Sequence, residues 1–354
     1  MRRARKILAA IGGSLVLLLA VCALAHHIQL KREEPLFSPF TKMVTVDGAQ
    51  MSVYAEGGGE HTLVFMPGSG TCSPALDFKA LYSQLSGTYQ IAVVERFGYG
   101  FSDRTNKSRD IGTLLENTRA ALAQAGLEPP YVLCPHSMSG LEAVYWAQQY
   151  PDEVQAIIGL DMSTPAAYEK MTISAPLLRL LQFGGAVGLT RFIPGLSDSA
   201  AIQSGALSEG EQDVYRAIFY RRTMTDDMIN EALCVKDNAK AVAAGGIPQV
   251  PFLLFCSDGS GGTGFSMEDW RAIQAGFAAE CSDARLIELD CGHYIHDFEY
   301  KRIAAEIKDF LSREGDGHGD FSQRQNQPHP GHTPQTGGRL PRFADGDAVR
   351  LPGG

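Results

Sequence analysis

Residues 131–140 are YVLCPHSMSG, a short apolar run followed by a tight turn that carries Ser137. The β-rich residues 131–134 have the composition of a buried strand. Apolar residues then recur at helical spacing over 138–145, which predicts a helix directly after the turn. A strand, a sharp turn and a helix in this order form the context in which a serine hydroxyl can be presented as a nucleophile.

The turn departs from the G-x-S-x-G pattern of such nucleophile elbows. Pro135 stands in place of the first glycine and Ser139 in place of the second. Ser139 is small and fits easily, whereas Pro135 is bulkier and fixes its own φ. Because a serine in a strand–helix turn can also cap the helix N-terminus, both a nucleophile and an N-cap are open interpretations of Ser137.

Outward from this motif, short apolar runs alternate with helical patterns. Residues 43–55 predict a β-hairpin that turns at Asp47-Gly48. The other predicted strands are 62–66, 91–94, 131–134, 156–160, 252–255 and 286–289. Continuous apolar strands separated by helices indicate an α/β domain with a mostly parallel sheet that is covered on both faces.

One connection is much longer than the others, since about ninety residues separate the predicted strands 156–160 and 252–255. It contains an apolar run over 173–192 and a polar helical stretch over 209–238. We interpret residues 163–248 as a helical cap inserted over the carboxyl ends of the strands, where open sheets bind ligands.

The two ends of the chain differ from this domain, which we place at residues 31–311. Residues 1–30 read as a membrane anchor or signal segment, and residues 312–354 are dominated by polar residues, glycine and proline. Such a composition lacks apolar side chains to bury, so we expect 312–354 to be a disordered tail.

Several further stretches resemble the α/β-hydrolase fold family, in the branch with a helical cap. Residues 67–70, PGSG, resemble its oxyanion loop, with Pro67 in place of histidine, and 95–102, ERFGYGFS, resemble the segment after its fourth strand. Gly292-His293 resembles its catalytic histidine loop. The resemblance covers residues 43–311 and implies an eight-stranded sheet with the cap after strand 6.

The resemblance also implies roles for individual residues. Ser137 would attack an acyl carbon, and His293, just past the last predicted strand, would act as its general base. The backbone N–H groups of Ser69 and Met138 would receive the oxyanion. His296, three residues further on, is the competing histidine.

The acid of the triad has two candidates. Asp258 follows the strand at 252–255, the usual place in the family, and gives the chain order Ser, Asp, His. Asp161 ends the strand at 156–160, which is an alternative place. We expect Asp258 to be the acid and Asp161 to hold the junction to the cap.

The N-terminus combines a basic flank with an uncharged apolar run from Ile7 to Ala25. As a helix this run spans about 28 Å, close to the hydrocarbon thickness of a bilayer. The basic residues before it favour a cytoplasmic N-terminus and an extracytoplasmic catalytic domain. A signal peptide cleaved after Ala23-Leu24-Ala25, with secretion of the remainder, is the alternative.

The composition of the chain limits the classes of binding partner that we expect. The net charge is −9 with no basic patch, so nucleic acid is not an expected partner. No cysteine or histidine spacing suits zinc, and no motif calls for a metal or cofactor. The expected partners are a small acyl substrate and a membrane. The apolar run over 177–192 is either cap core or a membrane-docking surface.

We therefore expect a serine hydrolase that cleaves a carboxylic ester or related acyl substrate. A serine at position 137 argues against the dehalogenases and epoxide hydrolases of the family, which need a carboxylate there. One alternative is a prolyl-aminopeptidase-like enzyme, and another is a non-catalytic binding protein with the same fold. The peptidase would need an acidic subsite in the cap, for which the candidates are Glu209, Glu211, Asp213, Asp226 and Asp227.

Overall fold

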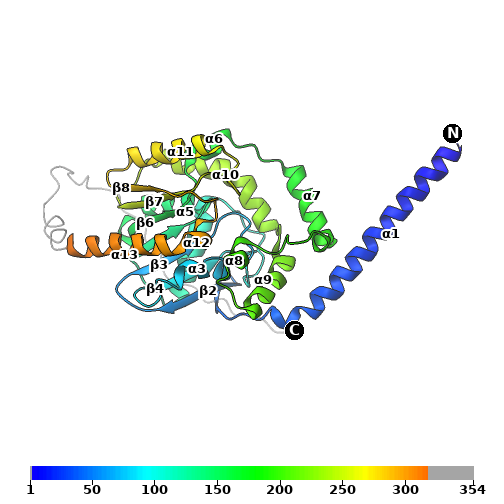
Figure 1. The fold of residues 1–354 in the computed structure, drawn as a ribbon, viewed down its shortest axis with the longest axis horizontal. Coiled ribbons are helices and arrows are strands. Elements are labelled where there is room, and N and C mark those ends of the chain that lie inside the picture. Colours follow the sequence, from blue (N-terminus) through cyan, green and yellow to red (C-terminus); the bar gives the residue numbers. More distant parts are fainter. Residues whose placement is uncertain (1, 318–354) are drawn as a thin grey trace, which may run out of the picture. The chain divides into compact units, whose positions relative to one another are not determined.

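An eight-stranded sheet forms the centre of the computed structural model, which describes residues 2–317 (Figure 1). The strand order is β1-β2-β4-β3-β5-β6-β7-β8, and all neighbours from β4 onward are parallel. The strands are β1 (Lys42–Val46), β2 (Ala49–Gly57), β3 (Thr62–Met66), β4 (Gln90–Glu95), β5 (Tyr131–Pro135), β6 (Val154–Leu160), β7 (Phe252–Cys256) and β8 (Ala284–Glu288). The predicted α/β class with a mostly parallel eight-stranded sheet is confirmed.

Strand burial follows from position in the sheet. All five residues of β5 and of β7 are buried, as expected for central parallel strands with helices on both faces. The antiparallel hairpin β1–β2 turns at Asp47 and Gly48, whose φ angles are 53° and 82°. This turn is the one that the Asp-Gly dipeptide predicts.

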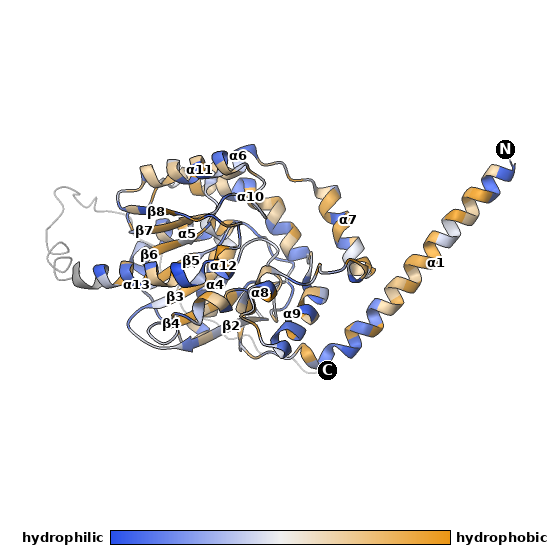
Figure 2. Cartoon of the chain, in the orientation of Figure 1, coloured by the Kyte–Doolittle hydropathy of each residue, from blue (hydrophilic) through white to orange (hydrophobic). Residues whose placement is uncertain are grey.

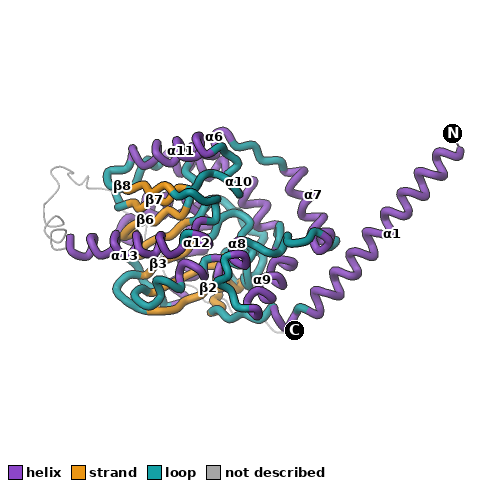
Figure 3. Tube along the Cα trace, in the orientation of Figure 1, coloured by secondary structure: helices purple, strands orange, loops and turns teal. Residues whose placement is uncertain are grey.

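Helices cover both faces of the sheet, which Figure 3 shows as orange strands between purple helices. The helices α4 (Ile111–Ala125), α5 (Ser139–Gln149) and α11 (Met267–Glu280) share one hydrophobic cluster with Val64 and other strand residues. Phe65, the next residue along β3, points the opposite way and packs against Phe78 at 5.3 Å between ring centroids. That face carries α2 (Pro74–Asp77), α3 (Lys79–Tyr82) and α12 (Ile295–Phe298).

The long connection between β6 and β7 is helical. Its elements are α6 (Pro165–Lys170), α7 (Ala175–Ala186), η3 (Leu189–Phe192), α8 (Ala200–Gln203), α9 (Glu209–Arg222) and α10 (Asp226–Ala244). The polar stretch predicted over 209–238 forms two helices. Met224 adopts a φ of 58°, and Thr225 caps α10 by accepting a hydrogen bond from the backbone N–H of Met228.

A single long helix, α1 (Arg2–Arg32), precedes the sheet and is followed by the short 3₁₀ helix η1 (Glu34–Leu36). Figure 2 shows an apolar middle with hydrophilic residues at both ends of α1. By length and composition α1 is able to cross a membrane, although a signal sequence meets the same criteria. The helix continues past Ala25, where the apolar run stops.

The C-terminal helix α13 (Tyr300–Gly317) extends beyond the predicted end of the domain. The boundary that we place after Leu311 falls inside this helix, because the residues that follow include the helix formers Arg313 and Glu314. The rest of the predicted tail, residues 318–354, lies outside the described residues.

Candidate active site

Ser137 sits in the turn between β5 and α5 with a φ of 53°, in the left-handed region that non-glycine residues rarely adopt. Such a conformation costs about 1–3 kcal/mol and persists only when its surroundings impose it. Here the N–H of Ser163 donates to the carbonyl of Ser137 at 2.7 Å. The N-cap of α5 is Met138 rather than Ser137, so the capping interpretation of Ser137 is wrong.

A buried polar network lies beneath the turn. The hydroxyl of Ser139 donates to the carbonyl of Pro67 and accepts a hydrogen bond from Arg96 Nη2 at 2.7 Å. Arg96 also forms a buried ion pair with Glu142 of α5 at 2.7 Å. This network connects the loop after β3 and the loop after β4 to the turn that carries Ser137. Its partners are far apart in the chain, so no local sequence pattern predicts it.

His293 lies in the loop between β8 and α12, and its Nδ1 is 2.6 Å from Oδ2 of Asp161. Both side chains are buried. Asp161 directly follows β6 with a φ of 50°. Three more donors reach its carboxylate, namely the N–H and the hydroxyl of Ser257, both at 2.7 Å, and Nε1 of Trp270 at 2.8 Å. Because Nδ1 faces the carboxylate, Nε2 of His293 is left for a catalytic partner.

The structure brings Asp161, and not the expected acid Asp258, into contact with His293. Asp258 lies just past β7, but its carboxylate turns back onto its own loop and accepts a hydrogen bond from the N–H of Ser260 at 2.8 Å. The side chain is partly exposed, and the hydrogen bonds from Ser260 lower the pKa of Asp258. Asp161 therefore occupies the place against His293. The end of β7 contributes donors from Ser257 to that carboxylate instead of contributing the acid.

Gly68 and Ser69 follow β3 and lie against the elbow. A Cβ atom on Gly68 would be 2.9 Å from the Cβ of Ser137, so only glycine allows this approach. The N–H groups of Ser69 and Met138 donate to no other backbone group among the described residues. Both residues line the same cavity as Ser137, so this arrangement is able to receive an oxyanion.

Two other histidines lie near His293. His296 is fully buried in α12, with Nε2 3.4 Å from Oδ2 of Asp77, and it does not line the cavity of Ser137. The ring of His136 packs against that of His293 at a tilt of 38° with ring centroids 4.5 Å apart, and its Nε2 lies 3.1 Å from the carbonyl of His293. Burial and the nearby imidazoles lower the pKa of His136 well below 6.5, so His136 is neutral. Its place directly before Ser137 is the signal that the sequence analysis passed over.

One group of described residues has metal-ligand types at close spacing, namely Asp77, His296 and Asp297. The Nε2 of His296 lies 3.4 Å from Asp77 and 3.8 Å from Asp297. Burial, and then the charge of Asp77, raise the pKa of Asp297 well above its ordinary value. Both carboxyl oxygens of Asp297 are buried without a hydrogen-bond partner among the described residues.

The cavity that contains Ser137 and His293 has a volume of about 360 Å³. No hydrogen bond joins these two described side chains directly. The far wall is apolar and comes from the connection between β6 and β7, with Leu177, Leu178 and Val235. None of the described lining residues is acidic. The acidic candidates for an amine subsite lie elsewhere, and three of them are paired, Glu211 with Lys79, Asp213 with Arg216 and Asp226 with Arg179.

Comparisons with known proteins agree with this fold. The family model described as alpha/beta hydrolase fold matches residues 61–300. The Bacillus subtilis (strain 168) protein YbdG, described as uncharacterized, is 37% identical over 309 residues, which cover 85% of this chain and 95% of that protein.

Solved structures are similar in fold. Cfl2 from Burkholderia cenocepacia has a TM-score of 0.62 at 18% identity, covering 76% of this chain and 95% of Cfl2. A loop variant of the haloalkane dehalogenase DbeA from Bradyrhizobium elkanii has a TM-score of 0.56 at 18% identity, covering 80% of this chain and 98% of that one. At such identities the likeness concerns the fold alone.

Proposed function

The chain belongs to the α/β-hydrolase fold family, and on that premise we propose that it is a serine hydrolase acting on carboxylic esters or related acyl substrates. One observation carries the proposal. Nδ1 of the buried His293 is 2.6 Å from Asp161. His293 lines the same cavity as Ser137, whose backbone has a φ of 53°. A strained serine beside an imidazole oriented by a carboxylate is the arrangement that acyl transfer requires.

The proposed reaction proceeds in two acyl-transfer steps. Nε2 of His293 takes the hydroxyl proton of Ser137 while Oγ attacks the carbonyl carbon. The N–H groups of Ser69 and Met138 stabilise the resulting oxyanion. When the oxyanion collapses, the ester C–O bond breaks, and His293 returns its proton to the leaving alcohol. A water molecule, activated in the same way, then releases the acid from Ser137.

The cavity wall indicates the kind of substrate. An apolar wall suits a hydrophobic acyl or alcohol group, because its burial contributes binding free energy. A peptidase that holds a substrate amine would need a carboxylate in this wall, and the described lining supplies none. The proposal is therefore an esterase rather than an aminopeptidase.

Covalent labelling tests the proposal. We expect a fluorophosphonate to form one adduct on the full-length protein, with mass spectrometry locating it at Ser137. Hydrolysis of p-nitrophenyl esters should disappear in parallel with adduct formation, whereas proline amides should not be turned over. An unlabelled Ser137 in folded protein, or labelling without loss of ester turnover, would contradict the proposal.

We also propose that α1 tethers this domain to a membrane. The exposed apolar run ends at Ala25, and the helix then continues into a polar segment. Full-length protein should sediment with membranes and resist extraction by alkaline carbonate, because removal of the helix would expose its apolar surface to water. A soluble mature form that begins near His26 would instead support signal cleavage.

A further inference from the structure

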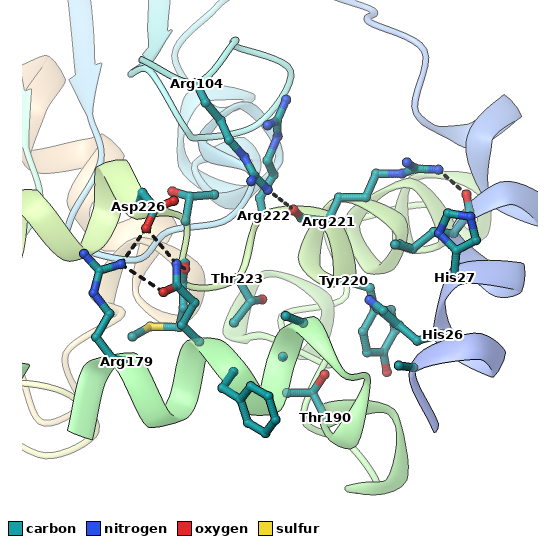
Figure 4. A pocket seen from close by; sticks show the side chains of 18 of the residues that line it. His26, His27, Arg104, Arg179, Thr190, Tyr220, Arg221, Arg222, Thr223 and Asp226 are labelled. Carbon is teal, nitrogen blue, oxygen red and sulfur yellow. Dashed lines mark hydrogen bonds and ion pairs between the residues drawn. The ribbon is translucent and has the colours of Figure 1, made fainter. Parts of the chain in front are cut away.

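A second cavity, of about 840 Å³, lies between the end of α1, helix α7 and the junction of α9 with α10 (Figure 4). It does not include Ser137 or His293. Side chains from four separate stretches of the chain converge on it. The basic groups among its lining residues are His26, His27, Arg104, Arg179, Arg221 and Arg222.

Most of this positive charge has no paired carboxylate. Arg179 forms an ion pair with Asp226 at 2.5 Å. Arg104, Arg221 and Arg222 form no ion pair with a described carboxylate, and their recorded hydrogen bonds go only to backbone carbonyls. The Nε of Arg221 is buried without a hydrogen-bond partner. Three guanidinium groups without a paired carboxylate at one cavity provide the donors that an anion needs.

The positive charge of Arg222 is likewise not balanced by a paired carboxylate. Burial, followed by the charge of Arg104, lowers the pKa of Arg222 to about 10. The charges of Glu95, Asp103 and Asp227 oppose this effect, but none of these described residues forms an ion pair with Arg222. A bound anion would relieve the repulsion between Arg104 and Arg222, and this relief favours binding.

The position of the cavity points to a lipid. Ala23, His26, His27 and Leu30 of α1 line it, so it begins where the apolar run of α1 stops. In a membrane, this is the level at which a spanning helix leaves the hydrocarbon and reaches the headgroups. Arg191 of η3 fixes this arrangement because it pairs with Glu33 at 2.7 Å and donates to His26 Nδ1 at 2.9 Å.

Exposed apolar side chains lie beside the cavity on α7 and η3. Leu180 is 64% exposed and Phe192 is 66% exposed, and they are accompanied by exposed Leu177, Leu181 and Phe183. In water such a group is unfavourable, whereas in the acyl region of a bilayer it contributes binding free energy. Of the two interpretations of residues 177–192, the exposure favours a membrane-docking surface.

We propose that this cavity binds the headgroup of a phospholipid with a net negative charge, whose phosphate has no cationic group beside it, while α7 and η3 insert beside α1. The inference rests on the proposed membrane tether and is independent of the catalytic residues. The guanidinium groups of Arg104 and Arg222 hold the phosphate oxygens. Leu177 and Leu178 of α7 line the catalytic cavity, whereas Arg179, Gln182 and Phe183 line the basic one. A bound lipid therefore also positions α7 beside the catalytic cavity.

The test uses full-length protein carrying Ser137→Ala, so that no ester of the added lipid is cleaved. The protein is held in neutral detergent, and native mass spectrometry measures binding of dioctanoyl phosphatidylglycerol, dioctanoyl phosphatidylcholine and inorganic phosphate. We expect phosphatidylglycerol to bind at least about tenfold more tightly than the other two. The double variant Arg104→Gln/Arg222→Gln should lose that preference.

A matched control removes two positive charges elsewhere. Arg216 of α9 pairs with Asp198 at 2.9 Å, and Arg285 of β8 pairs with Glu306 at 2.6 Å, and neither residue lines the cavity. Arg216→Gln/Arg285→Gln should bind phosphatidylglycerol as the parent does. Because Arg104 is exposed, Arg104→Gln alone keeps the test valid if the double variant does not fold.

Three results would overturn the proposal. Equal affinity for phosphatidylcholine would show that charge is not recognised, and equal affinity for inorganic phosphate would show a free-anion site. Unchanged phosphatidylglycerol binding in the folded Arg104→Gln/Arg222→Gln variant would place the lipid elsewhere. These three results do not depend on whether the protein hydrolyses esters, because each of them is a measurement of binding and not of turnover.

Discussion

Ser137→Ala is expected to lower kcat for ester hydrolysis by at least about 10⁴-fold, because it removes the hydroxyl on which the proposed acyl-enzyme forms. The thermal midpoint should change little, since Ser137 makes no recorded side-chain hydrogen bond and only its hydroxyl is removed. Steady-state kinetics and a thermal melt on the same preparation measure both quantities. Wild-type turnover in the folded variant would rule out Ser137 as the nucleophile.

Ser139→Ala provides the contrast, two residues along the same turn. The Ser139 hydroxyl bonds to Pro67 and Arg96 and lies away from the cavity lining. Its removal leaves a buried carbonyl and a buried guanidinium short of one partner each, which costs about 1–3 kcal/mol of stability. We therefore expect a lower thermal midpoint for Ser139→Ala and a much smaller change in kcat than for Ser137→Ala.

Asp161→Asn is expected to lower kcat by about 10⁴-fold, the effect that follows when a triad carboxylate is replaced by its amide. The carboxylate accepts the Nδ1–H of His293 and stabilises the imidazolium that forms during attack. An amide cannot stabilise that charge, and its NH₂ group can accept nothing from the surrounding donors.

Asp258→Asn is the matched control, because it makes the same chemical change on the neighbouring strand end. Its carboxylate bonds only within its own loop, so kcat should stay within a few-fold of wild type. Separate determination of kcat and KM for both variants distinguishes a catalytic loss from a change in substrate binding. Full activity in Asp161→Asn together with a large loss of activity in Asp258→Asn would show that Asp258, at the end of β7, is the acid.

Much of the fold is predictable because it depends on neighbours along the chain. Asp47-Gly48 has the backbone freedom that a tight hairpin turn needs, and the turn forms there. Continuous apolar runs such as β5 and β7 are buried on both faces, which only the centre of a parallel sheet allows. The boundary after Leu311 was less predictable, because polar residues that suit a tail also continue a helix.

Local sequence patterns do not identify the carboxylate that contacts His293. Asp161 and Asp258 both follow a strand of the sheet, and nothing near either residue in the chain distinguishes them. The choice depends on Ser257 and Trp270, which converge on Asp161 from β7 and α11 and leave room for His293. A side chain's partner across a sheet is decided by packing between distant segments, and a hydrogen-bond pattern of this kind has no signature in one sequence.

The sequence by itself determined the α/β architecture, the strand–turn–helix context of Ser137 and the apolar run of α1, because each depends on periodicity or on turn chemistry within a few residues. The histidine loop at His293 was predicted from its resemblance to the α/β-hydrolase family. Only the tertiary structure decided that Asp161 faces His293 and that arginines from three loops and helices share one cavity at the end of α1. These features arise from contacts between residues far apart in the chain, whose geometry exists only once the whole domain has packed.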